Sequence, residues 1–154
     1  MKIKLWIACA LGLSLPVWAG ESVGAEALPV IPAPMTCSVD SGYFYFTPST
    51  TIGVECESQL QMVSTFVDCL GRTAGFLPAI EVGAPEPDVR LTTVPSMAPE
   101  AYRLEVSAGR MTIKASGDAG FFYALQTLRQ LLPPAIEGVE PVARNLCRMP
   151  AMTV

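Results

Sequence analysis

The chain has 154 residues, of which 51% are hydrophobic and 16% are charged. This balance excludes an intrinsically disordered chain, which needs low hydrophobicity and high charge, and the length is that of one domain. The formal net charge of -4 argues against a nucleic-acid-binding protein, which needs a basic surface against the phosphates. Because the sequence contains no histidine, Ser-His-Asp and Cys-His catalytic arrangements and histidine-dependent zinc sites are also excluded.

The N-terminus has the pattern of a secretory signal peptide. Two lysines precede an apolar run that ends in Val-Trp-Ala at Ala19, a small residue suited to signal-peptidase cleavage. The run is too short for a membrane anchor, which takes about 20 apolar residues. Ala27 offers a second cleavage site. We therefore expect an exported protein, periplasmic or extracellular, with a signal peptide over 1–19 and a flexible leader over 20–27.

Four cysteines follow the expected signal peptide: Cys37, Cys56, Cys69 and Cys147. An even number in an exported chain permits disulfides, with three connectivities among which the sequence does not choose. Alternatively, the cysteines are small buried hydrophobic side chains. We favour this second interpretation because the chain has enough apolar residues to form a core without cross-links. No pair has the C-x-x-C spacing of a zinc site, and we expect no metal and no cofactor.

Extended segments come first in the chain. Alternating prolines from position 29 to 34 predict an extended entry segment, since the residue before a proline avoids the helical region. Residues 43–46 form an aromatic run that predicts a strand, with Tyr43 and Tyr45 on one face and the two phenylalanines on the other. Alternation over 52–54 predicts a second strand.

A first helix is predicted next. Ser58 and Gln61 have the spacing of a capping box, in which each side chain satisfies a backbone N–H of the first turn. Gly71 or Gly75 can end the helix, because glycine accepts the left-handed conformation there. The apolar residues at helical spacing, which we expect to face the core, are Leu60, Val63, Val67 and Leu70.

Alternating patterns then predict strands over 80–82 and 89–94, and a β-hairpin over 102–106 and 111–115. Asp118 is suited to the N-cap of a second helix, which the prolines at 133 and 134 end. The apolar face of this helix consists of Phe121, Leu125, Leu128 and Leu132. A last strand is predicted over 149–154.

The predicted order is strands, helix, strands, hairpin and helix. It lacks the strict alternation of a wound parallel sheet. We therefore predict an α+β fold, with a mostly antiparallel sheet and two helices packed on one face.

Carboxylates are the candidate catalytic groups that remain in a chain without histidine, because a pair of acids can supply both a general acid and a general base or nucleophile. No Asp-Glu dipeptide occurs, and we interpret the acidic residues as solvated surface. We therefore predict no catalytic, cofactor-binding or metal-binding residue. The acidic residues considered as catalytic candidates, and interpreted instead as surface residues, are Asp40, Glu55, Glu57, Asp68, Glu86, Asp88 and Asp118. Tyr43 and Tyr45 could stack on sugar rings, but an outward aromatic face on a core strand explains them equally well.

Several segments resemble glycoside hydrolase family 20. Ile-Pro-Ala-Pro at 31–34 and Gly-Tyr-Phe at 42–44 resemble the opening of the family's N-terminal domain. Glu-Ala-Tyr-Arg-Leu at 100–104 resembles its hairpin entry, and residues 120–132 are similar to its long G-x-x-x-G/A-L-Q-T-L-x-Q-L helix. Arg-Met-Pro-Ala-Met-Thr-Val at 148–154 resembles the strand that leads into the catalytic barrel of the family.

The resemblance implies a β-hexosaminidase N-terminal-like domain over 28–147, followed over 148–154 by the start of a linker to a (β/α)₈ barrel. In the family, an adjacent Asp-Glu pair on the barrel assists the substrate's own N-acetyl group, which is the nucleophile. Without that barrel, the resemblance implies a truncated, non-catalytic accessory domain of a secreted β-N-acetylhexosaminidase. Its expected partners are the barrel and N-acetylhexosamine glycans. A free-standing carbohydrate-binding or barrel-docking module is the alternative.

Overall fold

The structure is a computed structural model and describes residues 29–138 and 140–154. The expected signal peptide, both cleavage sites and the leader lie outside the described residues. Among the helices that are described, none combines the length and the apolar character needed to cross a membrane.

The strands are β1 (Ser38–Tyr45), β2 (Thr51–Val54), β3 (Ala79–Val82), β4 (Val89–Thr93), β5 (Tyr102–Val106), β6 (Met111–Ala115) and β7 (Arg148–Thr153). The helices are α1 (Glu57–Ala74), α2 (Asp118–Leu131) and two short 3₁₀ helices, η1 (Pro134–Glu137) and η2 (Arg144–Leu146).

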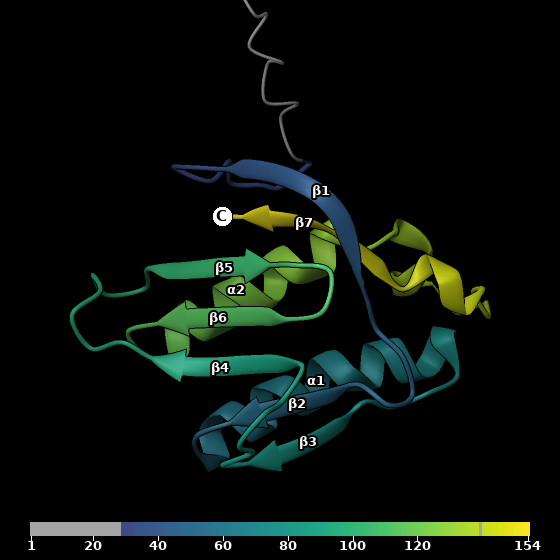
Figure 1. Ribbon diagram of the computed structural model, residues 1–154, viewed down its shortest axis with the longest axis horizontal. Coiled ribbons are helices and arrows are strands. Elements are labelled where there is room, and N and C mark those ends of the chain that lie inside the picture. Colours follow the sequence, from purple (N-terminus) through teal and green to yellow (C-terminus); the bar gives the residue numbers. More distant parts are fainter. Residues whose placement is uncertain (1–28, 139) are drawn as a thin grey trace, which may run out of the picture.

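The seven strands form one sheet in the order β1-β7-β5-β6-β4-β2-β3, with α1 and α2 on the same face (Figure 1). Strands β1, β7, β5 and β6 pair antiparallel, whereas β6, β4, β2 and β3 pair in parallel. Helix α1 connects β2 to β3 and returns the chain in the same direction, which makes that pair parallel. The predicted α+β class is confirmed, and the antiparallel pairs are confined to one half of the sheet.

Each predicted strand is present. The predicted hairpin is β5–β6, whose register pairs Tyr102 with Ala115 and Val106 with Met111. The last strand, β7, lies between β1 and β5. The segment that we expected to begin a linker is therefore also an inner strand of the sheet, next to the edge strand β1.

The predicted capping box of α1 is wrong. The N-cap is Cys56, which makes no side-chain capping bond, so the helix begins one residue before Ser58. Gln59 stabilises the helix start instead, because its Oε1 accepts a hydrogen bond of 2.8 Å from the backbone N–H of Glu55. The end of the helix is as predicted: Gly75 adopts φ 72°, a left-handed conformation that glycine accepts without strain.

The predicted N-cap of α2 is wrong by one residue. Gly117 is the N-cap and Asp118 is the first helical residue, where its carboxylate lies near the positive end of the helix dipole. Asp118 Oδ1 also accepts a hydrogen bond of 3.1 Å from Ser58 Oγ, which ties the starts of the two helices together. The chain leaves the helix at Leu132, ahead of the two prolines, as predicted.

The core lies between the helices and the sheet. The predicted stripe of α2 is confirmed, since Phe121, Leu125, Leu128 and Leu132 are all buried. The stripe of α1 is confirmed except for Leu60, which is only partly buried. Gly120 allows α2 to approach the sheet closely, because a Cβ there would lie 2.6 Å from the carbonyl oxygen of Ala101 and 2.9 Å from Ala115 Cβ.

The four described cysteines are free thiols. Cys69 and Cys147 are buried, which confirms their interpretation as small core residues, and burial raises the pKa of the Cys147 thiol. For Cys56 that interpretation is wrong, since it caps α1 in an exposed position. Cys37 is half-buried.

Candidate functional site

Two consecutive aromatic residues stand on the outer surface of α2. The period that buries Phe121 and Leu125 turns Phe122 and Tyr123 away from the sheet. Their side chains are 49% and 44% exposed, and their ring centroids are 5.8 Å apart in an edge-to-face arrangement. We call this pair the α2 ridge. Adjacent exposed aromatic rings are typical of surfaces that contact another molecule.

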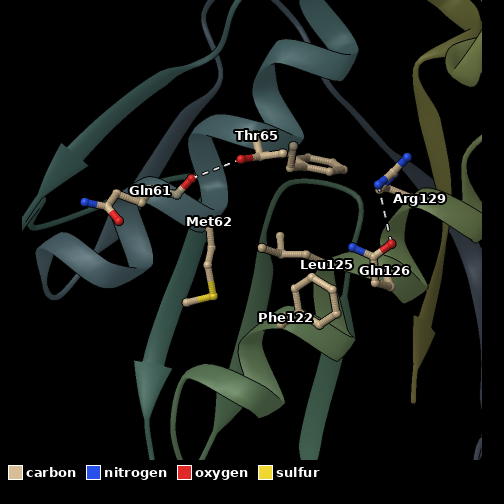
Figure 2. A pocket seen from close by; sticks show the side chains of 8 residues that line it. Gln61, Met62, Thr65, Phe122, Leu125, Gln126 and Arg129 are labelled. Carbon is tan, nitrogen blue, oxygen red and sulfur yellow. Dashed lines mark hydrogen bonds between the residues drawn. The ribbon is translucent and has the colours of Figure 1, made fainter.

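An apolar groove of about 250 Å³ lies beside the ridge, between α1 and α2 (Figure 2). Polar side chains border it on both helices. The groove is lined by Gln61, Met62, Thr65, Phe66, Phe122, Leu125, Gln126 and Arg129. Phe66 and Leu125 are buried core residues, so the floor of the groove is continuous with the core and is rigid.

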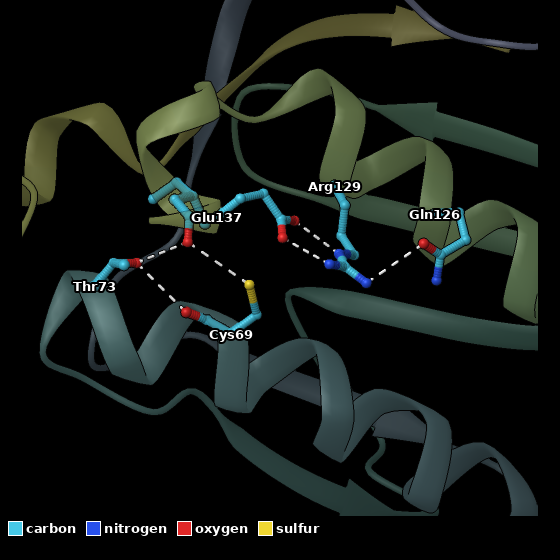
Figure 3. Close-up of polar contacts among 6 residues, drawn as sticks. Cys69, Thr73, Gln126, Arg129 and Glu137 are labelled. Atoms are coloured by element: carbon cyan, nitrogen blue, oxygen red, sulfur yellow. Dashed lines mark hydrogen bonds and ion pairs between the residues drawn. The ribbon is translucent and has the colours of Figure 1, made fainter. Parts of the chain in front are cut away.

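A bidentate ion pair holds Arg129 at the border of the groove. Its Nε and Nη2 donate to Glu137 Oε1 and Oε2 at 2.8 and 2.6 Å, and its Nη1 donates to Gln126 Oε1 at 3.4 Å (Figure 3). The hydrogen bond from Arg129 lowers the pKa of Glu137, and the same bond raises the pKa of Arg129. The guanidinium is therefore fixed in position and charged.

The carboxylate partner is fixed in turn by the packing of η1 on α1. The hydroxyl of Thr73 and the thiol of Cys69 both donate to the carbonyl oxygen of Ile136, at 3.2 and 3.7 Å (Figure 3). The backbone N–H of Val142 donates to the carbonyl oxygen of Thr73 at 2.8 Å. The contacts of α1 with η1 and with the loop residue Val142 thus determine where Glu137 lies, and the ion pair in turn positions Arg129.

A second hollow, of about 430 Å³, lies where α2 meets the entry segment. Gln130 closes one side of it with two hydrogen bonds to Ile31: its Oε1 accepts from the backbone N–H at 2.8 Å, and its Nε2 donates to the carbonyl oxygen at 3.2 Å. Tyr102 and Thr127 hydrogen-bond to each other at 2.7 Å in its wall. Since Phe122 lines the first hollow and Tyr123 the second, the α2 ridge stands between them.

The opposite face of the sheet is polar except at one edge. Tyr43 and Tyr45 are both exposed there, whereas Phe44 and Phe46 are buried, which confirms the predicted alternation. Arg148 of β7 lies over the ring of Tyr43, with Cζ 4.4 Å from the ring centroid. We call this face, which carries no helix, the open face.

In the part of the chain that the structure describes, the acidic residues do not come together in a cleft. Glu57 and Glu86 are exposed as predicted, and Glu86 pairs with Arg110 at 2.9 Å. For Asp88 the prediction of a solvated side chain is wrong: it is half-buried, and its Oδ2 accepts hydrogen bonds from the N–H and hydroxyl of Thr51. Across residues 29–138 and 140–154, no three acidic or cysteine side chains are arranged to hold a metal ion.

The sequence interpretation missed the α2 ridge and the fixed Arg129. The signal for the ridge was present, because Phe122 and Tyr123 fall outside the helical stripe of Phe121, Leu125 and Leu128. No sequence pattern predicts the ion pair of Arg129, because Glu137 comes close to α2 only after the chain turns at the two prolines.

Residues 27–154 match the family model for domain 2 of glycosyl hydrolase family 20. The chain is 29% identical over 122 residues to a beta-hexosaminidase of Porphyromonas gingivalis, in a match that covers 76% of this chain and 16% of that protein. Its fold is similar to that of the N-acetyl-beta-hexosaminidase of Streptomyces plicatus, with a TM-score of 0.74 and 28% identity. The GH20 beta-N-acetylhexosaminidase of Streptomyces coelicolor A3(2) gives a TM-score of 0.74 at 27% identity.

Each of these two matches covers 83% of this chain and 26% of the Streptomyces chain, so the chain spans only a minor part of the length of its relatives. The family model, in contrast, matches nearly all of the chain, including every described strand and helix. The chain therefore belongs to glycosyl hydrolase family 20, in which it corresponds to domain 2.

Proposed function

We propose that this chain is the N-terminal accessory domain of an exported β-N-acetylhexosaminidase, and that its helical face supports the catalytic barrel of that enzyme. The parent activity is proposed from family membership and from the names of the relatives. The observation that supports the structural part of the proposal is the α2 ridge, with its two exposed aromatic rings between two hollows.

The composition of the helical face suits a stable contact with another domain. Aromatic and arginine side chains carry most of the energy in protein interfaces, and they act best when they are held in place before binding. Phe122 and Tyr123 supply the aromatic area, and the ion pair with Glu137 holds Arg129 in position at the border. The exposed rings would insert into pockets of the barrel, while Gln61 and Gln126 form the polar rim.

Among residues 29–138 and 140–154, no pair of acids is arranged for the acid–base chemistry of glycoside hydrolysis. That reaction needs a positioned acid beside the leaving oxygen together with a nucleophile or its substrate-borne substitute. Glu55, Asp88 and Asp118 each accept hydrogen bonds at the ends of strands or helices, where their role is structural. We expect no hydrolysis of an aryl N-acetylglucosaminide by the purified chain. Turnover that survives stringent purification and is lost on mutation of one carboxylate here would contradict this expectation.

Export is proposed from the pattern of residues 1–19. N-terminal sequencing of the protein recovered outside the cytoplasm tests it. We expect the mature chain to begin at Gly20 or at Leu28. A chain that retains Met1 in every compartment would contradict export with cleavage.

The link to a barrel is tested first at the level of the gene. A reading frame that continues beyond Val154 into an Asp-Glu-containing barrel supports the proposal, whereas an unrelated long domain there argues against it. In the barrel-containing protein, Phe122→Ala should lower the thermal midpoint and the activity half-life, because truncation of a central interface aromatic costs about 2 kcal/mol or more. Tyr45→Ala, on the open face, is the matched control and should leave both unchanged. Equal effects of the two variants would contradict docking through the helical face.

A further inference from the structure

We propose that the open face carries a glycan-binding site, in which Tyr43, Tyr45 and Arg148 bind a chain of β-linked N-acetylhexosamine away from the catalytic domain. The choice of N-acetylated sugar rests on the proposed function. The existence of a sugar-binding surface rests on the geometry of the three side chains alone.

The two tyrosine rings are exposed and rigidly mounted. Tyr43 and Tyr45 are 42% and 44% exposed, and Phe44, which lies between them in β1, is buried. Phe44 packs edge-to-face on Phe46 at 5.1 Å, and Phe46 packs on Phe66 of α1 at 5.8 Å. Because the core fixes the strand in this way, the rings lose little conformational entropy when a ligand binds.

The relative orientation of the rings suits a sugar chain. Their centroids are 6.4 Å apart and their planes are inclined by 58°, so they form an angled cradle rather than a flat platform. Pyranose rings present C–H-rich faces that pack on aromatic rings, and consecutive units of a β-linked chain are rotated relative to each other. The cradle therefore favours a soluble oligosaccharide over a flat crystalline surface.

Arg148 adds a hydrogen-bonding group to the cradle. It lies opposite Tyr45 in the β1–β7 register, while its guanidinium lies over the ring of Tyr43. The cation–π contact fixes the guanidinium in position and covers one face of the Tyr43 ring, so Tyr45 supplies the main stacking surface for a sugar. In the described part of the chain, Arg148 forms no salt bridge to a carboxylate, so its N–H groups are available to a ligand. The carbonyl oxygen of an N-acetyl group is an acceptor that these N–H groups can bind.

The charges of the chain favour a neutral ligand. The net charge is -4, which disfavours anionic polymers. Elsewhere on the open face, Glu105 pairs with both Lys114 and Arg103 at 2.9 Å, so these charges are already neutralised. An uncharged sugar that carries amide groups is not repelled by the negative net charge, and its amide oxygen can accept a hydrogen bond from Arg148. The cradle lies on the side of β1 that faces away from the buried Phe44 and Phe46, whereas the α2 ridge lies on the outer surface of α2. The two surfaces share no residue, so one ligand can occupy each at the same time.

Titration calorimetry of the purified chain with the β-1,4-linked hexamer of N-acetylglucosamine tests the proposal, with cellohexaose as the second ligand. We expect saturable binding of the N-acetylated hexamer and weaker binding of cellohexaose. Tyr45→Ala should raise the dissociation constant about tenfold, as expected for loss of one stacking contact. Tyr45→Phe should retain binding, and Phe122→Ala on the helical face is the matched control that should leave it unchanged.

Arg148→Gln gives an independent readout, because it should remove the preference for the N-acetylated hexamer over cellohexaose while leaving the tyrosine cradle in place. If Tyr45→Ala fails to fold, Arg148→Gln alone is sufficient to test the proposal. No heat at millimolar hexamer, binding that neither variant weakens, or equal binding of the two hexamers by the unmodified chain would each overturn the proposal. None of these binding measurements depends on hydrolysis or on the barrel. The binding results can therefore be interpreted even if the barrel-docking proposal fails.

Discussion

The two faces of the sheet are built from the same strands and differ in what they expose. On the helical face, α1 and α2 cover the sheet and then present two aromatic rings and an apolar groove to the outside. On the open face, the strands β5 and β6 present the ion-paired side chains of Arg103, Glu105 and Lys114, and exposed rings occur only at one edge, where β1 carries Tyr43 and Tyr45. Polar side chains can remain in water there, whereas the exposed rings of the helical face gain from being covered.

This difference between the two faces implies that the residues that stabilise the fold are not the residues proposed to bind partners. The residues that fold the chain lie between the helices and the sheet, and the residues proposed to bind partners lie outside that layer on either side. Substitutions in the core layer should therefore lower the stability of the fold, and substitutions on either face should change binding while leaving the stability nearly unchanged.

The largest effect is expected in the core layer. Leu128→Ala should lower the free energy of unfolding by about 2–5 kcal/mol, because it removes a fully buried side chain and leaves a cavity against the sheet. Urea denaturation followed by circular dichroism measures the change. A loss below about 0.5 kcal/mol, the range of surface substitutions, would mean that α2 does not pack as described.

A smaller loss is expected where α2 comes closest to the sheet. Gly120→Ala should cost about 1–3 kcal/mol through overpacking against the carbonyl of Ala101, offset by up to about 1 kcal/mol of helix propensity. Gly109→Ala is the matched control, since no heavy atom lies within 4 Å of a Cβ built there. Thermal unfolding of the two variants should give a lower midpoint for Gly120→Ala only. Equal midpoints would contradict the close approach of α2.

One carboxylate on each face should make stability depend on pH. Hydrogen bonding to Arg129 lowers the pKa of Glu137, and hydrogen bonding to Lys114 lowers the pKa of Glu105. A lowered folded-state pKa gives stability that is present above the unfolded pKa, near 4.5, and is lost as the pH falls through the folded pKa. Both pairs are partly exposed, so each contributes below about 1 kcal/mol.

Glu137→Gln and Glu105→Gln should each reduce the acid-induced loss of stability between about pH 5 and pH 3, as measured by denaturation at a series of pH values. The double variant should show the sum of the two effects, because the pairs lie on opposite faces and share no partner. An unchanged pH dependence in both single variants would show that neither ion pair contributes to the fold.

The smallest effect on stability is expected from the exposed rings themselves. Phe122→Ala and Tyr45→Ala should each change the unfolding free energy of the isolated chain by about 0.5 kcal/mol or less. Chemical denaturation of both variants tests this. A loss above about 2 kcal/mol for either ring would make it a core residue, and the division between folding and binding would fail.

The sequence was sufficient for the local features of this fold. Each strand, the β5–β6 hairpin and the buried stripe of α2 were predictable, because alternation and helical spacing report directly which side chains face the core. The N-caps differ from the predicted ones by two residues in α1 and by one in α2. Cys56 and Gly117 have the extended backbone of a cap but make no side-chain capping bond, whereas Ser58 and Asp118 were predicted from their residue types.

Features that depend on long-range pairing were not predictable. The parallel half of the sheet arises because β4 lies between β2 and β6, an order that no local pattern specifies. The fixed Arg129 depends on Glu137, which η1 places against α1 through contacts of Thr73 and Cys69. In the sequence, the α2 ridge is recognisable only as two aromatic residues outside the buried stripe. Its interpretation as a contact surface depends on the two hollows beside it, which the sequence does not predict.

Hydroxyl-radical footprinting, read residue by residue in the isolated chain and in the barrel-containing protein, tests the proposed roles of the two faces most directly. In the isolated chain, Phe122, Tyr123, Tyr43 and Tyr45 should all be oxidised, since each is more than 40% exposed. When the barrel is present, Phe122 and Tyr123 should become protected while Tyr43 and Tyr45 remain reactive. Protection of the two tyrosines of the open face, with Phe122 and Tyr123 still oxidised, would contradict the account.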